Sequence, residues 1–75
     1  MNVCVLIRVK PGKLKKVLGQ LRGLKGVKEV LTTFGRYDVV IFASVKDYDQ
    51  AKSITRDINA IKEVKSTETL IEAEE

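Results

Sequence analysis

The chain has 75 residues, 44% of them hydrophobic and 32% charged, and its formal net charge is +4. This length supplies one hydrophobic core, since domains typically occupy ~100–150 residues, and the apolar share excludes a disordered chain. The lack of histidine and the single cysteine exclude a structural zinc site and a Ser-His-Asp relay. We therefore expect one domain over residues 1–75 that holds no metal or cofactor and is not an enzyme.

The chain begins with a predicted strand and helix. Apolar, mostly β-branched residues alternate with their neighbours over residues 3–9, which is the period of a strand, and residues 10–12, Lys-Pro-Gly, break it. Leucine and valine then recur at helical spacing from Leu14 up to Gly23 or Gly26. Glycine favours the end of a helix, so the first helix is predicted to stop there.

Two strands joined by a tight turn are predicted next. Residues 27–34 and residues 39–45 are both rich in apolar and β-branched side chains, and the later run is apolar on both faces. Between them lies Gly-Arg-Tyr-Asp at residues 35–38, and glycine and aspartate are typical of turns. The pattern predicts a β-hairpin.

A second helix and a final strand complete the pattern. Asp47 is a good N-cap for a helix over Tyr48–Asn59, in which alanine and isoleucine fall on one stripe. Val64–Ile71 reads as the last strand, so the order of elements is β-α-β-β-α-β. This order predicts a ferredoxin-like α+β sandwich, with a four-stranded antiparallel sheet and both helices on one of its faces.

The first and third predicted strands present apolar side chains to both faces of this sheet. One face carries Cys4, Leu6, Val40 and Phe42, and the other carries the alternate residues of the same strands. Two helices cover only one face, and a small chain without disulfides or metal often relies on association. We therefore expect a homodimer in which the sheets of two copies pack face to face.

Charge is distributed unevenly along the chain. Every charged residue before Glu29 is basic, whereas glutamates dominate the charged positions of the C-terminal end. A basic first half attracts nucleic acid, so a weak nonspecific nucleic-acid binder is one alternative function. Lysines interleaved with leucines are more typical of the solvated side of an amphipathic helix, and that interpretation carries more weight.

Candidate ligand-binding groups lie in the hairpin turn and in the last strand. Gly35 permits a positive φ and close approach of a ligand to backbone amides, which suits a carboxylate. Asp38 can accept from an ammonium group, and Thr67 and Thr69 offer hydroxyls on the same side of a strand. Each residue also has an ordinary structural interpretation, and together they match the two charged ends of an α-amino acid.

The Gly-Arg-Tyr-Asp turn and the strand Val-Lys-Ser-Thr-Glu-Thr at residues 64–69 resemble the effector-binding (RAM) domain of the Lrp/AsnC family of feast/famine transcriptional regulators. The resemblance covers nearly the whole chain. It implies a dimeric α/β barrel paired through its sheets, octamers of four dimers, and an amino-acid effector bound in crevices between dimers. The ligand-binding residues that it implies are Gly35, Tyr37, Asp38, Thr67 and Thr69, with Thr33 and Phe34 as weaker candidates.

The sequence departs from the family pattern at its start. Family regulators carry a helix-turn-helix ahead of this domain, whereas Met1 is followed directly by the first predicted strand. The resemblance therefore implies a stand-alone effector domain without specific DNA binding, which modulates transcription by assembly with full-length Lrp/AsnC regulators. An alternative is a small dimeric α/β-barrel enzyme that uses Tyr37 and Asp38 as its polar pair.

No segment of the sequence predicts contact with a membrane. The apolar run over residues 3–7 is too short for a signal peptide and is followed at once by arginine and lysine. A run of ~18 apolar residues, which a transmembrane helix needs, is missing as well. We expect a cytoplasmic protein.

Overall fold

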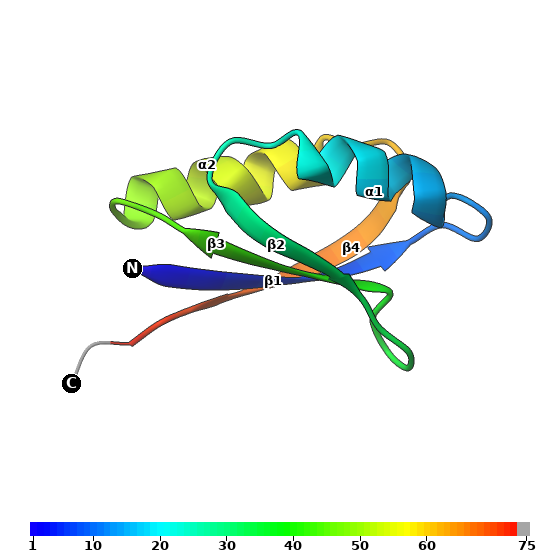
Figure 1. Cartoon of the computed structure of the whole chain (residues 1–75), viewed down its shortest axis with the longest axis horizontal. Coiled ribbons are helices and arrows are strands. Elements are labelled where there is room, and N and C mark those ends of the chain that lie inside the picture. Colours follow the sequence, from blue (N-terminus) through cyan, green and yellow to red (C-terminus); the bar gives the residue numbers. More distant parts are fainter. Residues whose placement is uncertain (74–75) are drawn as a thin grey trace.

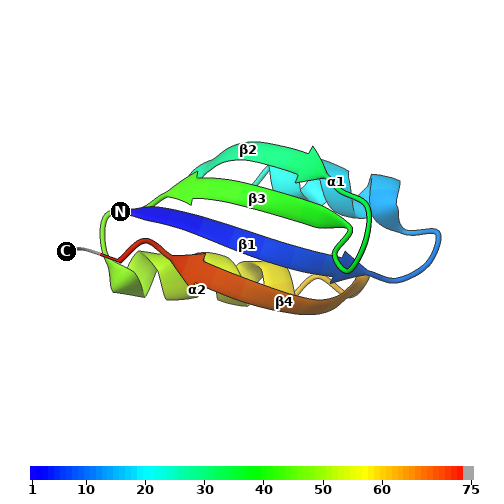
Figure 2. The same cartoon turned by 90° about the horizontal axis from the view of Figure 1, so that it is seen from below.

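The computed structural model describes residues 1–73. It contains, in chain order, β1 (Asn2–Val9), α1 (Leu14–Arg22), β2 (Val27–Thr32), β3 (Val39–Ser44), α2 (Tyr48–Asn59) and β4 (Val64–Ile71). Both helices lie on one side of a single sheet (Figure 1). The strand order is β2-β3-β1-β4 and every neighbouring pair is antiparallel, as seen from the helix-free side in Figure 2. The predicted ferredoxin-like α+β fold is confirmed.

The first strand lies in the middle of the sheet and sets its register. Cys4 is opposite Phe42 of β3 on one side and Leu70 of β4 on the other, so these three side chains form one row across the sheet. Leu6 is likewise opposite Val40 and Glu68. Because side chains alternate along a strand, both rows lie on the same face.

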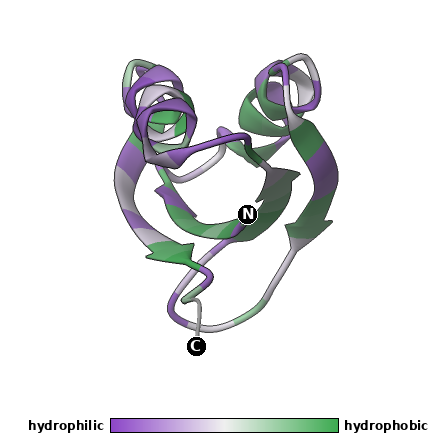
Figure 3. Ribbon diagram, turned by 90° about the vertical axis from the view of Figure 1, so that its left-hand side faces the viewer, coloured by the Kyte–Doolittle hydropathy of each residue, from purple (hydrophilic) through white to green (hydrophobic). Residues whose placement is uncertain are grey.

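The core lies between the other face and the two helices. Val5, Ile7, Val39 and Ile41 are completely buried there, together with Val17 and Leu21 of α1 and Ile58 of α2. Figure 3 shows this arrangement end-on, with the sheet curving beneath the two helices. The alternation predicted for the first strand and the apolar stripes of both helices are therefore confirmed.

The two helices begin differently. The Asp47 side chain caps α2 by accepting from the backbone N–H of Gln50 at 2.9 Å, as the sequence predicts. The first helix has Lys13 at its N-cap position without a side-chain cap, and no acidic residue lies in its first turn. It ends at Arg22, with Gly23 as the C-cap, which is the earlier of the two predicted ends. Neither helix is long and apolar enough to cross a membrane.

The hairpin departs from its predicted bounds. The second strand ends at Thr32 instead of residue 34, because Thr33 closes the turn: its hydroxyl donates to the Tyr37 carbonyl at 2.7 Å and its N–H to the Asp38 carbonyl at 3.0 Å. Phe34 is thereby left in the turn with its side chain fully exposed. Gly35 has a φ of 108°, the left-handed conformation expected of it.

Candidate functional site

The face of the sheet that no helix covers, which we call the outer face, carries several apolar side chains. The Phe42, Leu31 and Leu70 side chains are 41%, 42% and 52% exposed. Between them lie Cys4, Leu6 and Val40, which are partly exposed. Burial among these neighbours raises the pKa of the Cys4 thiol, so this group stays protonated and apolar near neutral pH. The outer face thus has a partly exposed apolar patch at its centre.

The hairpin turn is fastened to the end of β1 by Asp38. Its Oδ2 accepts from the Val9 backbone N–H at 2.8 Å, and its own N–H donates to the Ile7 carbonyl at 2.9 Å. One carboxylate oxygen is therefore engaged by the fold. The other, Oδ1, forms no hydrogen bond within the part of the chain that the structure describes. Asp38 is held in place and retains acceptor capacity for a ligand.

Tyr37 connects the turn to the far edge of the sheet. Its hydroxyl donates to Oε2 of Glu68 on β4 at 2.7 Å. That hydrogen bond is the main cause of a raised Tyr37 pKa, with desolvation and the carboxylate charge acting in the same direction. Glu68 lies opposite Leu6, so this contact is on the outer face of the sheet.

The two predicted threonines lie on the opposite face, against α2. The Thr67 hydroxyl donates to the side-chain oxygen of Asn59 at 3.0 Å, and the Thr69 and Thr55 hydroxyl oxygens are 2.9 Å apart. The Thr55 hydroxyl also donates to the Ala51 carbonyl at 3.1 Å. A hydroxyl has one proton, so Thr69 must be the donor to Thr55, and its oxygen is left as an acceptor.

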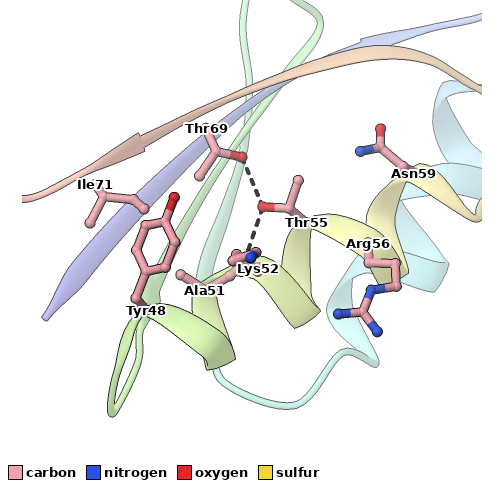
Figure 4. A pocket seen from close by; sticks show the side chains of 8 residues that line it. All are labelled: Tyr48, Ala51, Lys52, Thr55, Arg56, Asn59, Thr69 and Ile71. Carbon is pink, nitrogen blue, oxygen red and sulfur yellow. Dashed lines mark hydrogen bonds between the residues drawn. The ribbon is translucent and has the colours of Figure 1, made fainter.

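A groove between α2 and β4 opens beside this hydroxyl pair (Figure 4). Its volume is about 480 Å³, within the range of small-molecule sites. The lining side chains are Tyr48, Ala51, Lys52, Thr55, Arg56, Asn59, Thr69 and Ile71.

The sequence pointed to only part of this groove. Of the predicted ligand-binding residues, Thr69 lines it, whereas the contributions of α2 were missed. Tyr48, Lys52, Arg56 and Asn59 recur at three- and four-residue spacing and so share one stripe of the helix. This spacing can be read from the sequence, but it does not by itself distinguish a ligand-binding stripe from an ordinary solvated one.

The structure brings the predicted residues together in two groups instead of one. Thr33, Gly35, Tyr37 and Asp38 gather in the hairpin turn, held by the bonds from Thr33 and by the contacts to β1 and β4. Thr67 and Thr69 face α2. The Tyr37 hydroxyl and the two threonines thus lie on opposite faces of the sheet.

A single ion pair, between α1 and the segment after α2, is present within residues 1–73. Lys16 Nζ lies 3.1 Å from Oε2 of Glu63, whose side chain is largely buried. The hydrogen bond from Lys16 is the main cause of a lowered Glu63 pKa, partly opposed by desolvation. The described residues hold no cluster of three acidic or cysteine side chains arranged for a metal ion.

The chain is similar to one known family over nearly its whole length. Residues 2–75 match the family model described as the Lrp/AsnC ligand binding domain. A curated relative, the HTH-type transcriptional regulator FL11 of Pyrococcus abyssi, is 34% identical over 71 residues, which is 95% of this chain and 47% of that protein. The chain thus spans about half the length of this relative.

Solved structures agree with this similarity. The structure of Escherichia coli AsnC matches at a TM-score of 0.89 and 28% identity, over 99% of this chain and 51% of AsnC. Two chains of similar length also match. A Thermus thermophilus protein has a TM-score of 0.91 and 28% identity, over 99% of this chain and 94% of that one. FFRP-DM1 has a TM-score of 0.87 and 26% identity, over 96% and 97%.

Proposed function

This chain belongs to the family of Lrp/AsnC ligand-binding domains, and from that membership we propose that it is a regulatory module that senses an amino acid bound between subunits. The family match supports the regulatory and effector-binding role. The remaining parts of the proposal, which are the dimer, the ligand and the route to DNA, rest on the geometry of the outer face, the hairpin turn and the groove.

The proposed dimer pairs the outer faces of two copies. Leu6, Val40 and Phe42 lie at the centre of that face, and exposed apolar surface of this kind is rare on monomers unless it binds something. A hollow of about 290 Å³ beside Cys4, Phe42 and Leu70 offers space for a side chain of the partner. A two-fold pairing of identical faces closes on itself, and further contacts between such dimers build the proposed octamer.

One observation carries the proposal that the effector lies between subunits. The Tyr37 hydroxyl and Thr69 lie on opposite faces of the sheet: the hairpin turn offers the second Asp38 carboxylate oxygen as an acceptor, and the groove offers the Thr69 oxygen together with cationic donors from α2. We propose that the ligand contacts the turn of one chain and the groove of another. Binding would then depend on assembly, and assembly on the ligand.

Thermal shift across the twenty amino acids, with light scattering in parallel, tests the effector role. A ligand at a hundred times its dissociation constant stabilises the folded state by about 2.7 kcal/mol, which raises the melting temperature measurably. We expect one amino acid or a small group of them to do so and to change the mass in solution. No shift with any amino acid at millimolar concentration would contradict the proposal.

The proposed route to DNA is indirect. Specific recognition of a DNA sequence requires an element that enters a groove of the duplex. Both helices within residues 1–73 instead pack their apolar stripes against the sheet. We propose that the chain acts by joining full-length Lrp/AsnC regulators through the shared outer face. In a gel shift, the isolated chain should bind DNA only weakly, without sequence preference, and should lose that binding steeply as salt rises. Specific, salt-resistant binding would contradict this route.

A further inference from the structure

The groove between α2 and β4 has one sign of charge. Among its eight lining residues the charged ones are Lys52 and Arg56, both cationic, and no carboxylate lines it. Neither cation forms an ion pair anywhere in residues 1–73. They are four residues apart on the exposed stripe of α2, so both side chains leave the helix on the same side. A small anion entering the groove would meet two cationic side chains that have no internal partner.

The hydrogen bonds around the groove divide donors from acceptors. The side-chain oxygen of Asn59 is occupied by the Thr67 hydroxyl, which leaves its NH₂ group as a donor. On the strand side, the Thr69 oxygen is an acceptor because its proton is directed to Thr55. Donors and positive charge thus lie along α2, and an acceptor lies on β4.

Apolar groups line the part of the groove between these polar edges. Ala51 is buried, Ile71 is partly buried, and the Tyr48 ring lines the groove at the first turn of α2. Lys52 Nζ lies 5.6 Å from the centre of that ring, within cation–π distance, so the ammonium group lies beside the groove. The lining therefore suits a ligand with a short apolar body and a negatively charged end.

We infer that this groove is the carboxylate-binding half of the effector site, in which Lys52 and Arg56 hold the carboxylate and Ala51 and Ile71 contact the body of the ligand. This deepens the proposed function and rests on it for the ligand's being an amino acid. The ammonium end then points away from α2, toward the Thr69 oxygen and toward the turn that another subunit presents. The arrangement sets the orientation of the ligand as well as its class.

The test follows backbone amide signals of the ¹⁵N-labelled full chain by NMR during titration with isovalerate, with isovaleramide and with a mixture of the twenty amino acids. Isovaleramide has the shape of isovalerate without its charge. We expect isovalerate to shift the signals of residues 51–59 and 69–71, and isovaleramide to bind at least tenfold more weakly. Equal binding of the two would overturn the inference.

Three variants separate charge at the groove from charge in general. Lys52→Gln and Arg56→Gln should each weaken isovalerate binding by about tenfold, which corresponds to about 1.4 kcal/mol. Arg22→Gln is the matched control, because Arg22 is an exposed arginine in the last turn of α1 as Arg56 is in α2, and it should bind as the unmodified chain does. All three positions are exposed, and dispersed spectra will verify folding.

The same titrations distinguish this inference from the proposed function. Amino acids that shift only the signals of residues 33–38, with a silent groove, would overturn the inference and leave amino-acid sensing intact. Charge-dependent binding of isovalerate with no response to any amino acid would support the groove as a carboxylate site and refute amino-acid sensing. Loss of binding in Arg22→Gln equal to that in Arg56→Gln would show a general charge effect and overturn the inference.

Discussion

The two faces of the sheet are built from alternate residues of the same strands, yet they differ in what covers them. On the helix side, Val5, Ile7 and Ile41 are completely buried within the chain. On the outer face, Phe42, next to Ile41 in the chain, retains 41% of its exposure. Both faces are apolar, so composition alone does not separate them. One face stabilises the fold of a single chain, whereas the other is left partly exposed and is the proposed interface.

The largest expected effect follows from placing a charge on the outer face. In the proposed dimer, Phe42→Glu would bury an unpaired carboxylate between two sheets, which costs roughly 3–5 kcal/mol of association free energy. We expect monomers with unchanged helix content, measured by sedimentation velocity and circular dichroism. Lys25→Glu, at an exposed position on the helix side, is the control for added negative charge. A Phe42→Glu protein that stays dimeric would refute the outer face as the interface.

A cavity on the helix side should act on the single chain. Ile41→Ala removes a completely buried side chain and should lower the free energy of unfolding by about 2–5 kcal/mol. Denaturant titrations at several protein concentrations check this. The loss in Ile41→Ala should be nearly independent of concentration, while the loss in Phe42→Ala should shrink as the protein is diluted, because dissociation removes the contact. The opposite pattern would reverse the roles assigned to the two faces.

The hairpin turn should separate structural from ligand-binding contributions. Asp38→Ala leaves the Val9 N–H without its acceptor, which should lower stability by about 1–3 kcal/mol, and it also removes the proposed acceptor for the ligand ammonium. Asp38→Asn keeps a side-chain oxygen for Val9 but removes the charge. We expect it to fold as stably as the unmodified chain and to bind its amino acid more weakly, as measured by thermal shift. Unchanged binding in Asp38→Asn would remove the charge of Asp38 from the ligand site.

The smallest expected effects concern the pH dependence of stability. The contact of Glu63 is lost toward low pH, and the contact of Tyr37 is lost toward high pH. Glu63 has a folded pKa below its ordinary value of 4.5, so its contact with Lys16 contributes stability above that pH and loses it as pH falls through the folded value. Tyr37 has a folded pKa above its ordinary value of 10.0, so its bond to Glu68 contributes below that pH and loses it as pH rises through the folded value.

Denaturation midpoints measured across pH check both signs. Lys16→Gln should flatten the acid limb of the profile and leave the alkaline limb, while Tyr37→Phe should do the reverse. The effects are modest because Lys16 and Tyr37 are both solvent-accessible. Flattening of the same limb by both variants would show that the two contacts are not independent.

Much of the difference between the two faces could be predicted from hydrophobic periodicity and composition. The alternation of residues along the strands predicts both apolar faces of the sheet. The helical spacing of apolar residues predicts α1 and α2 with their buried stripes. The hairpin lies where the sequence predicts it, but β2 ends before its predicted end. The hydroxyl of Thr33 bonds across the turn, and periodicity does not reveal this contact. The contact between Val9 and Asp38 joins residues 29 apart, and that between Tyr37 and Glu68 joins residues 31 apart. Such pairs depend on register, which single-sequence patterns leave open.

The groove was harder to predict for the same reason. Thr69 was a candidate, but its partner Thr55 lies 14 residues earlier on a helix whose polar side looked ordinarily solvated. Only the pairing of β4 with β1 brings that polar side next to the strand. The direction of the hydroxyl chain, from Thr69 through Thr55 to the Ala51 carbonyl, also follows from geometry and not from residue types.

The central place of β1 has a consequence for synthesis of the chain. Its partners β3 and β4 both come later in the chain, so both edges of β1 are paired only once Ile71 has been made. Until then a nascent chain carries an apolar strand with open hydrogen-bonding groups, the condition in which strands associate with wrong partners. Contacts this distant in sequence also slow folding, since the loop between them must close first. We therefore expect a chain stalled before residue 64, which lacks β4, to be more prone to aggregation than the chain that includes it.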